Sequence, residues 1–264
     1  METNLLKALH HLKQVNDFSL SAHYSSSNRM NHMGVALEYF VKDAFCNSLH
    51  ISDTDEKDKE HSKYFSYLGN DKNPPDFLIR GGDAVEVKKL TKPLNVLALN
   101  SSYPKNHLYA DSTMIAKACR QAEAWEMRDI IYAVGVVPST TLKLLWFVYG
   151  DCYAADREVY ERPRQRIIET LDAIYDDDGP RPKTRELGRV NRVDPLGITY
   201  LRIRGMWAMQ GPIKAFNYLR IDRNRAPSIV ALMRAEKYCT FAESDRKPLE
   251  ESGCVRDVEI KGAG

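Results

Sequence analysis

The sequence predicts an α/β protein in which a mixed central sheet is flanked by helices, and two patterns support this. Runs rich in Val, Ile, Leu and aromatic residues, bounded by Gly, Pro and Asn, predict strands at 64–68, 77–79, 84–90, 130–137 and 142–149. Apolar residues at helical spacing predict helices within 1–22 and at 33–49, 112–128 and 157–175. Because the two kinds of element alternate along the chain, we expect helices to cover the faces of one sheet.

The elements suggest a single domain over residues 1–264, since no repeat or sharp boundary divides the chain. The helix at 33–49 is apolar over much of its surface, which indicates a buried position. Residues 51–62, where Asp and Glu alternate with Lys, are predicted to form a charged loop. The core is expected at about 28–155, and a basic segment at about 181–220 follows an acidic break.

Charge and composition exclude several classes of protein. Lys and Arg number 38 and Asp and Glu 36, so the formal net charge is +2, which argues against a histone-like binder but not against a DNA enzyme. The sequence has neither a run of 18 apolar residues nor a secretory leader, so we expect a cytoplasmic protein outside the membrane. The five cysteines form no CxxC pair, which argues against a structural zinc site and a disulfide framework.

Residues 74–88 carry the clearest chemical pattern in the chain. A Pro-Pro pair forces a turn before Asp76, and a Gly-Gly pair joins the two short strands that follow as a hairpin. Side chains alternate between the two faces of a strand, so Glu86 and Lys88 share one face while the valines beside them face the core. The hairpin should bring Asp76 beside this pair, so that two carboxylates and a lysine converge.

Two carboxylates and a lysine at one point are suited to hydrolysis of a phosphodiester. Asp76 and Glu86 offer oxygen ligands for Mg²⁺, which proteins hold with one or two carboxylates plus water and phosphate. The metal would lower the pKa of a bound water and neutralise the charge that develops on phosphate. Lys88 is suited to orient or deprotonate the attacking water. Glu38, on the preceding helix, is a candidate fourth catalytic group that could hold a second ion or its waters.

This arrangement is typical of PD-(D/E)xK nucleases, but other interpretations compete with it. Surface hairpins often carry Glu and Lys on a solvated face, and Glu38 taken alone is more typical of a solvated helix position. The order of turn, strand, Gly-rich turn and strand favours the catalytic interpretation. The segment from His61 to Lys63 begins like the HxK motif of phospholipase D, but Leu68 stands where that motif needs an acidic residue.

A second informative region is suited to DNA binding. Residues 183–207 mix Arg with Asn and Asp, and these side chains complement guanine, adenine and cytosine in the major groove. The small polar residues of 98–105 could donate to phosphates or base edges. A solvated basic strand and an ordinary loop are the alternatives. The candidate DNA-contacting residues are Arg29, Asn31, Lys89, Asn100, Ser101, Ser102, Tyr103, Lys105, Arg185, Arg189, Asn191, Arg192, Asp194, Arg202 and Arg204.

Several blocks of the sequence resemble the NgoPII-like type II restriction endonucleases, a bacterial branch of the PD-(D/E)xK superfamily. The blocks are 73–76 with 86–89, 98–105, 149–155, 187–197 and 201–207. The resemblance implies a PD-(D/E)xK nuclease core, Mg²⁺ dependence, a homodimer, and cleavage of double-stranded DNA at a short palindrome, with GGCC as the target. It also implies a functional pairing with a DNA methyltransferase. The last forty residues match no block of that family.

Two other functions remain open from the sequence. A PD-(D/E)xK nuclease of DNA repair would cut without sequence specificity, and a non-catalytic protein of the same fold would only bind DNA. The intact set of Asp76, Glu86 and Lys88 argues against the second of these.

Overall fold

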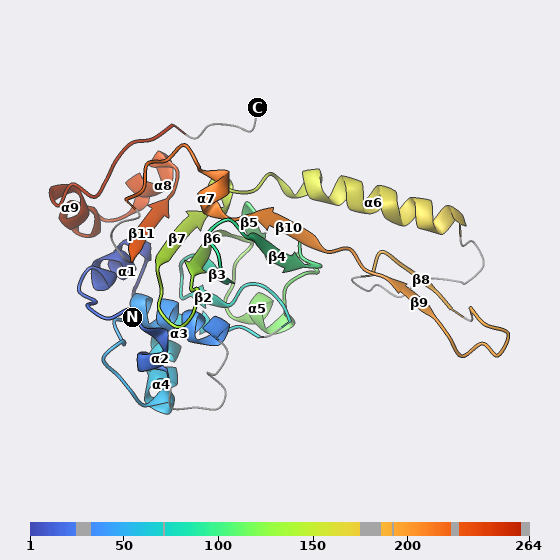
Figure 1. Cartoon of the computed structure of the whole chain (residues 1–264), viewed down its shortest axis with the longest axis horizontal. Helices are drawn as coiled ribbons and strands as arrows, with labels where there is room; N and C mark the ends of the chain where they lie inside the picture. Colours follow the sequence, from blue (N-terminus) through green and yellow to red (C-terminus); the bar gives the residue numbers. More distant parts are fainter. Residues whose placement is uncertain (25–32, 71, 175–185, 192, 223–226, 260–264) are drawn as a thin grey trace.

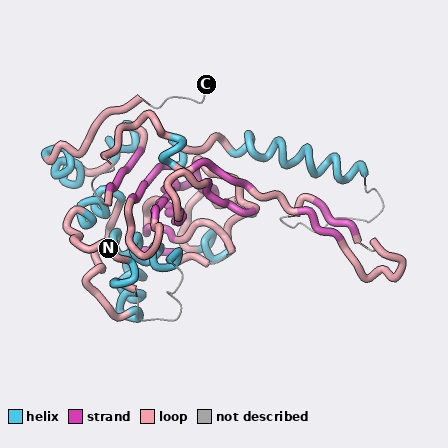
Figure 2. The backbone as a smooth tube through the Cα atoms, viewed as in Figure 1, coloured by secondary structure: helices cyan, strands magenta, loops and turns pink. Residues whose placement is uncertain are grey.

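A mixed sheet forms the centre of the protein in the computed structural model (Figures 1 and 2). The structure describes residues 1–24, 33–70, 72–174, 186–191, 193–222 and 227–259. Its strands run in the order β1-β2-β3-β6-β7-β11, with β5 paired to β6. They are β1 (Phe65–Tyr67), β2 (Phe77–Ile79), β3 (Ala84–Leu90), β5 (His107–Tyr109), β6 (Met127–Val136), β7 (Leu144–Tyr149) and β11 (Ser228–Leu232). β3 pairs with β6 and β7 with β11 in parallel, and the other pairs are antiparallel. The predicted mixed sheet is confirmed.

The N-terminal helices pack against this sheet and against one another. They are α1 (Leu5–Leu12), α2 (Leu20–His23), α3 (Met33–Cys46) and α4 (Thr54–Tyr64). α3 lies on the sheet, where the ring of Phe45 is 5.7 Å from that of Phe77 and 6.2 Å from that of Phe147. The predicted buried helix at 33–49 is confirmed, and it ends at Cys46 because Asn47 takes the left-handed conformation, with φ 55°.

Two predicted elements are wrong. Residues 51–62 are mostly helix α4 rather than a loop. Asp53 caps its start by accepting from the Glu56 amide at 2.8 Å, and the side chains that the helix buries, Lys57 and His61, are polar rather than apolar. The helix predicted at 112–128 is reduced to α5 (Lys117–Gln121). The chain beyond it is already extended at Met127, which pairs with Tyr109 of β5, so sheet pairing overrides the helical spacing there.

An arm projects from this body, formed by α6 (Arg157–Ile174) and the paired strands β8 (Gly188–Val190) and β9 (Leu201–Ile203) (Figure 1). It joins the body through β10 (Trp207–Gln210), which pairs antiparallel with β4 (Val96–Asn100). The predicted helix at 157–175 is confirmed. The strands β4, β8 and β10 are absent from the sequence prediction.

The C-terminal segment is part of the fold. After α7 (Pro212–Ala215), β11 pairs with β7 over five residues, and α8 (Ala235–Thr240) and α9 (Glu243–Glu251) follow. α9 reaches the N-terminus, where the Asn4 side-chain amide donates to Asp245 at 2.8 Å. Among the described residues, none of the helices combines the length and the apolar character that a membrane crossing needs.

Candidate active site

A cleft of about 210 Å³ opens beside the β2–β3 hairpin. Its wall is made by side chains of α3, of the loop 68–74, of β3, of the loop that follows β4, and of β6. Asp76, Glu86, Lys88 and Glu38 all line it, so the structure brings together the four residues predicted to be catalytic.

The hairpin fixes the positions of three of these groups. The amide of Asp76 donates to the Val85 carbonyl at 3.0 Å, and its carboxylate accepts from the Val87 amide at 2.6 Å. Asp76 is therefore held by backbone on the neighbouring strand, next to Glu86. Glu86 and Lys88 share one face of β3, and Lys88 Nζ donates to Glu86 at 2.5 Å, whereas Val85 and Val87 are buried on the other face.

The loop before Asp76 approaches it closely because residue 69 is glycine. Gly69 has φ +87°, and a Cβ atom there would collide with the Asp76 carbonyl oxygen. Asn70 then holds the loop, since its side-chain oxygen accepts from the amides of Lys72 and Asn73 at 2.8 and 2.9 Å. The Gly69-Asn70 pair thus forms one wall of the cleft, a role that the sequence analysis missed.

The cleft concentrates negative charge. Burial and the carboxylates of Glu86 and Glu38 raise the pKa of Asp76 well above its usual range, although Lys88 and a backbone amide offset part of this. Burial alone would lower the pKa of Lys88, but the surrounding carboxylates outweigh it, so its pKa is raised. Three carboxylates, those of Asp76, Glu86 and Glu38, therefore surround Lys88.

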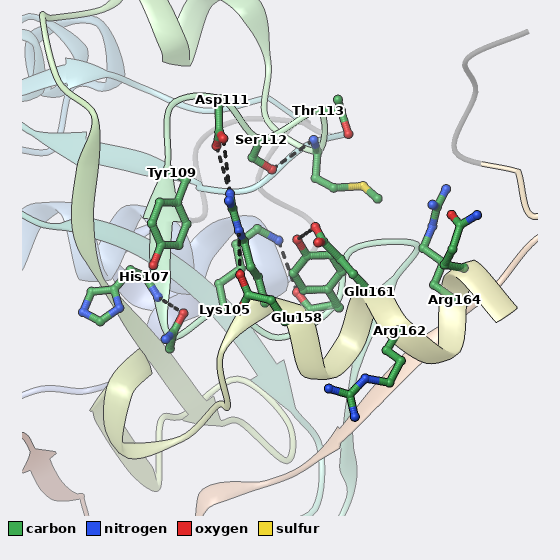
Figure 3. A pocket seen from close by; sticks show the side chains of 15 residues that line it. Lys105, His107, Tyr109, Asp111, Ser112, Thr113, Glu158, Glu161, Arg162 and Arg164 are labelled. Atoms are coloured by element: carbon green, nitrogen blue, oxygen red, sulfur yellow. Dashed lines mark hydrogen bonds and ion pairs between the residues drawn. The ribbon is translucent and has the colours of Figure 1, made fainter.

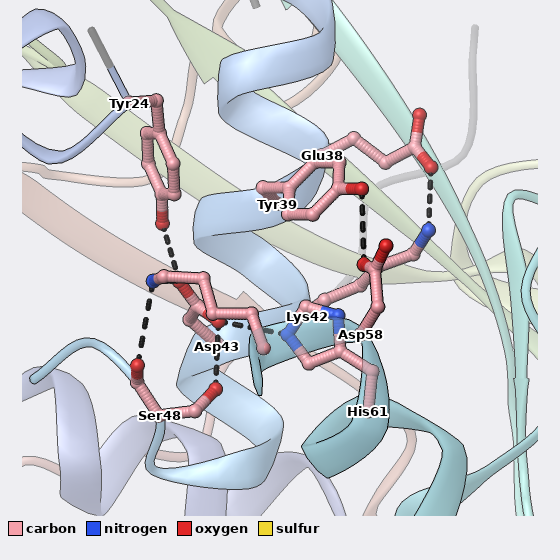
Figure 4. A network of polar contacts seen from close by, with 9 residues as sticks. Tyr24, Glu38, Tyr39, Lys42, Asp43, Ser48, Asp58 and His61 are labelled. Carbon is pink, nitrogen blue, oxygen red and sulfur yellow. Dashed lines mark hydrogen bonds and ion pairs between the residues drawn. The ribbon is translucent and has the colours of Figure 1, made fainter. Parts of the chain in front are cut away.

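Glu38 is anchored from its own helix. Lys42, one turn further along α3, donates to Glu38 at 2.6 Å and to the Leu68 carbonyl at 3.1 Å (Figure 4). Lys42 is buried, with 5% of its surface exposed. It therefore connects Glu38 to the loop that begins at Leu68, which also lines the cleft. The i to i+4 spacing of Glu and Lys is a sequence signal for this pair, and the sequence analysis did not use it.

The residues present fit a hard divalent cation. Glu86 Oε2 is buried and has no hydrogen-bond partner among the described residues. A cation would satisfy this oxygen, and it would offset the burial and the repulsion from Glu86 and Glu38 that raise the pKa of Asp76. Within the described ranges no three acidic, His or Cys side chains form a metal site by themselves. Two carboxylates suffice for Mg²⁺, which keeps several waters and takes phosphate oxygens.

The loop predicted to contact DNA reaches the same cleft. The cleft is also lined by five residues of this loop, Asn100, Ser101, Ser102, Tyr103 and Lys105, beside the four residues predicted to be catalytic. Asn100 adopts φ +52° at the end of β4, which turns the chain toward the cleft. Lys89, the next residue after Lys88, is exposed.

The arm carries the described part of the basic segment. The guanidinium of Arg189 stacks on the Tyr200 ring at 4.4 Å, and Arg202 and Arg204 both pair with Glu186. Asn191 is exposed, and Asp194 accepts from the Leu196 and Thr199 amides at 2.9 and 2.6 Å. Arg202 lies within β9, whereas Arg204 lies just beyond its end at Ile203. Four candidate residues lie outside the described ranges: Arg29, Asn31, Arg185 and Arg192.

The sequence model of the NgoPII restriction endonuclease family matches residues 3–263. The chain belongs to this family. The curated type II restriction enzyme NgoPII of Neisseria gonorrhoeae is 43% identical over 264 aligned residues, which cover 98% of this chain and 93% of that enzyme. No solved structure matches the chain. The resemblance inferred from blocks between 28 and 220 is therefore confirmed, and it extends to the last forty residues.

An aromatic cluster joins the arm of this NgoPII-family chain to its cleft, and the sequence analysis missed it. Tyr103, from the cleft, stacks on Tyr160 of α6 with ring centroids 5.5 Å apart. Trp207 of β10 meets both rings edge-on, at 6.3 and 5.5 Å. Trp207 also pairs with Asn100 across β10 and β4. The cluster thus fixes the base of the arm against the loop at the cleft.

A second cleft, of about 630 Å³, lies between the segment 105–114 and α6 (Figure 3). It shares Tyr103 and Lys105 with the first. Arg157 crosses it to pair with Asp111 at 3.2 Å, and acidic side chains of α6 balance much of its positive charge. This mixture of charges makes it a poorer candidate for the catalytic centre than the smaller cleft.

Proposed function

We propose that this member of the NgoPII family cleaves both strands of DNA at a short palindrome in a Mg²⁺-dependent reaction, with Asp76, Glu86, Lys88 and Glu38 as its catalytic groups. Family membership gives the reaction class, that of a type II restriction enzyme and site-specific deoxyribonuclease. The observation that carries the assignment of the site is the convergence of the four side chains around a buried, unpartnered oxygen of Glu86.

The surroundings of each group suggest its role. Asp76 and Glu86 would hold Mg²⁺, which when bound acts as a Lewis acid that offsets negative charge on the reacting phosphate. Lys88 has a raised pKa, so it stays protonated at neutral pH and donates to a phosphate oxygen or to the attacking water. Glu38 is held by Lys42 at the edge of the cleft, where it orients water.

DNA would be held by the loop 100–105 next to the cleft and by the arm. The target GGCC presents guanine O6 and N7 acceptors in the major groove, which arginine forks complement. Arg189, Arg202 and Arg204 of the arm are suited to this, with Asn191 near the bases. The loop 100–105 supplies donors for the phosphates next to the scissile one.

A homodimer follows from the chemistry. Each chain contributes one such cleft, and both strands of a palindrome are cut, so two copies related by a twofold axis are the simplest arrangement. An enzyme of this kind acts in the cytoplasm beside a methyltransferase that protects the same sites in the host DNA.

Digestion of phage lambda DNA with the purified chain tests this function. We expect discrete fragments with Mg²⁺, none with EDTA, and ends that map to GGCC. A smear would point to a nuclease without specificity, and binding without cleavage would point to a catalytically silent protein. Discrete fragments that end elsewhere would overturn only the target sequence.

A further inference from the structure

Glu38 already has a cation bound to it, the ammonium group of Lys42 (Figure 4). Lys42 Nζ donates to Oε1 of Glu38 at 2.6 Å and to the carbonyl oxygen of Leu68 at 3.1 Å. A carboxylate oxygen and a backbone carbonyl oxygen are also ligands that hard divalent cations take in proteins. The ammonium group therefore occupies oxygens that a metal ion at Glu38 would use.

Lys42 is held in this position by its surroundings. Only 5% of its surface is exposed, and Nζ lies 5.7 Å from the centre of the Tyr39 ring and 5.9 Å from that of Phe77. The faces of these rings attract a cation. A buried charge is strongly disfavoured once it leaves its partners, so Lys42 is a fixed neighbour of Glu38 rather than a side chain that an incoming ion displaces.

The charge balance of the cleft also disfavours a second divalent ion. Five ionisable groups interact there, and they are Asp76, Glu86, Glu38, Lys88 and Lys42. When all are ionised, three carry a negative charge and two a positive charge, so their sum is −1. One divalent ion and one phosphodiester bring this sum to zero. Lys72 and Lys105, which also line the cleft, add positive charge, so a second divalent ion would be repelled.

We propose that Lys42 takes the role of a second metal ion at Glu38, so that the cleft binds one divalent cation, at Asp76 and Glu86. The inference rests on the proposed function, which assigns these two carboxylates to Mg²⁺. Nucleases that use two ions place metal charge on both the attacking and the leaving oxygen of the phosphate. Here a fixed ammonium group supplies the positive charge beside Glu38, and Glu38 is left to orient water. Lys42 is thus a positioning residue, because it acts through Glu38.

Counting bound Mn²⁺ by electron paramagnetic resonance tests the role of Lys42 without requiring catalysis. Mn²⁺ prefers the same oxygen ligands as Mg²⁺. The wild type should bind one ion per chain. Lys42→Met should bind a second, because it frees the oxygens of Glu38 and Leu68, and adding Glu38→Gln to it should return the number to one. Lys42→Arg, which keeps the charge, and the control Lys63→Met, which breaks the exposed pair with Glu60, should bind one ion like the wild type.

The outcomes separate this inference from the proposed function. If the wild type binds two ions, or Lys42→Met gains none that depends on Glu38, the inference fails, while loss of an ion in Asp76→Asn would still support the proposed site. If the wild type binds no ion, or keeps its ion in Asp76→Asn, but Lys42→Met gains one that Glu38→Gln removes, the role of Lys42 stands and the proposed site fails.

A variant that is less disruptive covers the case in which Lys42→Met does not fold, as judged by circular dichroism. Glu38→Gln alone should then bind one Mn²⁺ as tightly as the wild type, because Glu38 holds no ion while Lys42 is bound to it. Loss of an ion in Glu38→Gln would overturn the inference.

The Mg²⁺ dependence of plasmid cleavage extends the test to the complex with DNA, in which phosphate oxygens also contact the metal. The rate of the wild type should rise with a Hill coefficient of about one, and that of Lys42→Met with a higher coefficient. A coefficient of about two for the wild type would overturn the inference.

Discussion

At the scale of single residues, Asp43 is the buried charge with the most partners in the described chain. Its carboxylate is fully buried and accepts from Tyr24 and His61 at 2.7 Å and from Ser48 at 2.6 Å (Figure 4). Lys57 of α4 also donates to it and is itself buried. Charged groups are tolerated in a core only when they are paired in this way. The network fixes α4 to α3, the helix that presents Glu38 to the cleft.

We expect Asp43→Asn to lower the free energy of unfolding by about 3–5 kcal/mol, because it leaves Lys57 buried without a counter-charge. Urea unfolding followed by circular dichroism measures the loss. Glu60→Gln is the matched control, since it breaks the exposed pair with Lys63 on the same helix and should cost less than about 1 kcal/mol. Combining Asp43→Asn with Lys57→Met should recover part of the loss. Equal effects of Asp43→Asn and Glu60→Gln would contradict this role.

The same carboxylate predicts a dependence of stability on pH. Burial raises the pKa of Asp43, but the hydrogen bond from His61 and the contacts with Lys57 and Ser48 outweigh it, so its pKa is lowered. A lowered folded-state pKa contributes stability above the unfolded value of about 3.9, and this is lost as the pH falls toward the folded value. Unfolding measured from about pH 6 down to pH 3 should therefore show a steeper loss for the wild type than for Asp43→Asn. Parallel curves would argue against the shift.

At the scale of elements, the β2–β3 hairpin is supported by contacts from three other segments of the chain. Arg128 donates to the Ile79 and Gly82 carbonyls in its turn. Glu123 accepts from the Gly81 amide at 3.1 Å. From the C-terminal segment, Lys237 of α8 lies 2.7 Å from both Asp83 and Asp129. The position of Asp76 thus depends on residues far from it in the sequence.

We expect Lys237→Met to cost about 1–3 kcal/mol of stability, because it leaves two neighbouring carboxylates without their shared cation. The cleavage rate should fall as well, since Asp83 lies at the start of the strand that carries Glu86. Lys237→Arg, which keeps the charge, should restore most of both properties. Thermal unfolding and the rate of plasmid cleavage are the measurements. If Lys237→Met left hydrogen exchange at 79–85 unchanged, the role of Lys237 in supporting the hairpin would be contradicted.

The arm makes a separate prediction about specificity. If Arg202 reads guanine, Arg202→Ala should reduce the discrimination between GGCC and single-mismatch duplexes by about 1–3 kcal/mol. If it contacts only phosphate, binding to all sequences should weaken alike, and the salt slope should fall by about one. Gel shifts in Ca²⁺ on both duplexes distinguish the cases. Arg166→Ala, on the exposed surface of α6, is the control.

The elements that sequence could predict are those fixed by local chemistry. The hairpin at 77–90 follows from a Gly-Gly turn between apolar runs, and its pattern already places Glu86 and Lys88 on one face. Helix α4 could not be recognised by apolar spacing, because its buried side chains are Lys57 and His61. Lys42 and Trp207 enter or border the site only through packing between distant segments, which no local pattern encodes.

At the scale of the whole molecule, the C-terminal forty residues complete the nuclease rather than extend it. β11 is an edge strand of the central sheet, paired with β7, and Lys237 of α8 pairs with Asp83 of the β2–β3 hairpin. The family match over residues 3–263 agrees with this arrangement. The short sequence blocks that resemble the family did not include this segment. Its residues support the sheet and the hairpin, and many different sequences can provide such support.

In the proposed function the body of the molecule cleaves DNA and the arm binds it. The body holds the cleft with Asp76, Glu86 and Lys88, and the arm carries Arg189, Arg202 and Arg204. The aromatic cluster of Tyr103, Tyr160 and Trp207 connects the two. Cleavage at a defined site requires that the groups that read DNA and those that cut it keep a fixed relation, which this cluster provides.

Plasmid cleavage by Asp76→Asn, measured beside DNA binding, tests the central claim most directly. The substitution keeps the size of the side chain and removes one of two carboxylates proposed to hold Mg²⁺. We expect cleavage with Mg²⁺ to fall by about 10³-fold or more, while binding in Ca²⁺ stays the same or tightens because a negative charge near the phosphate is lost. Cleavage by Asp76→Asn at the rate of the wild type would contradict the assignment of this cleft as the active site.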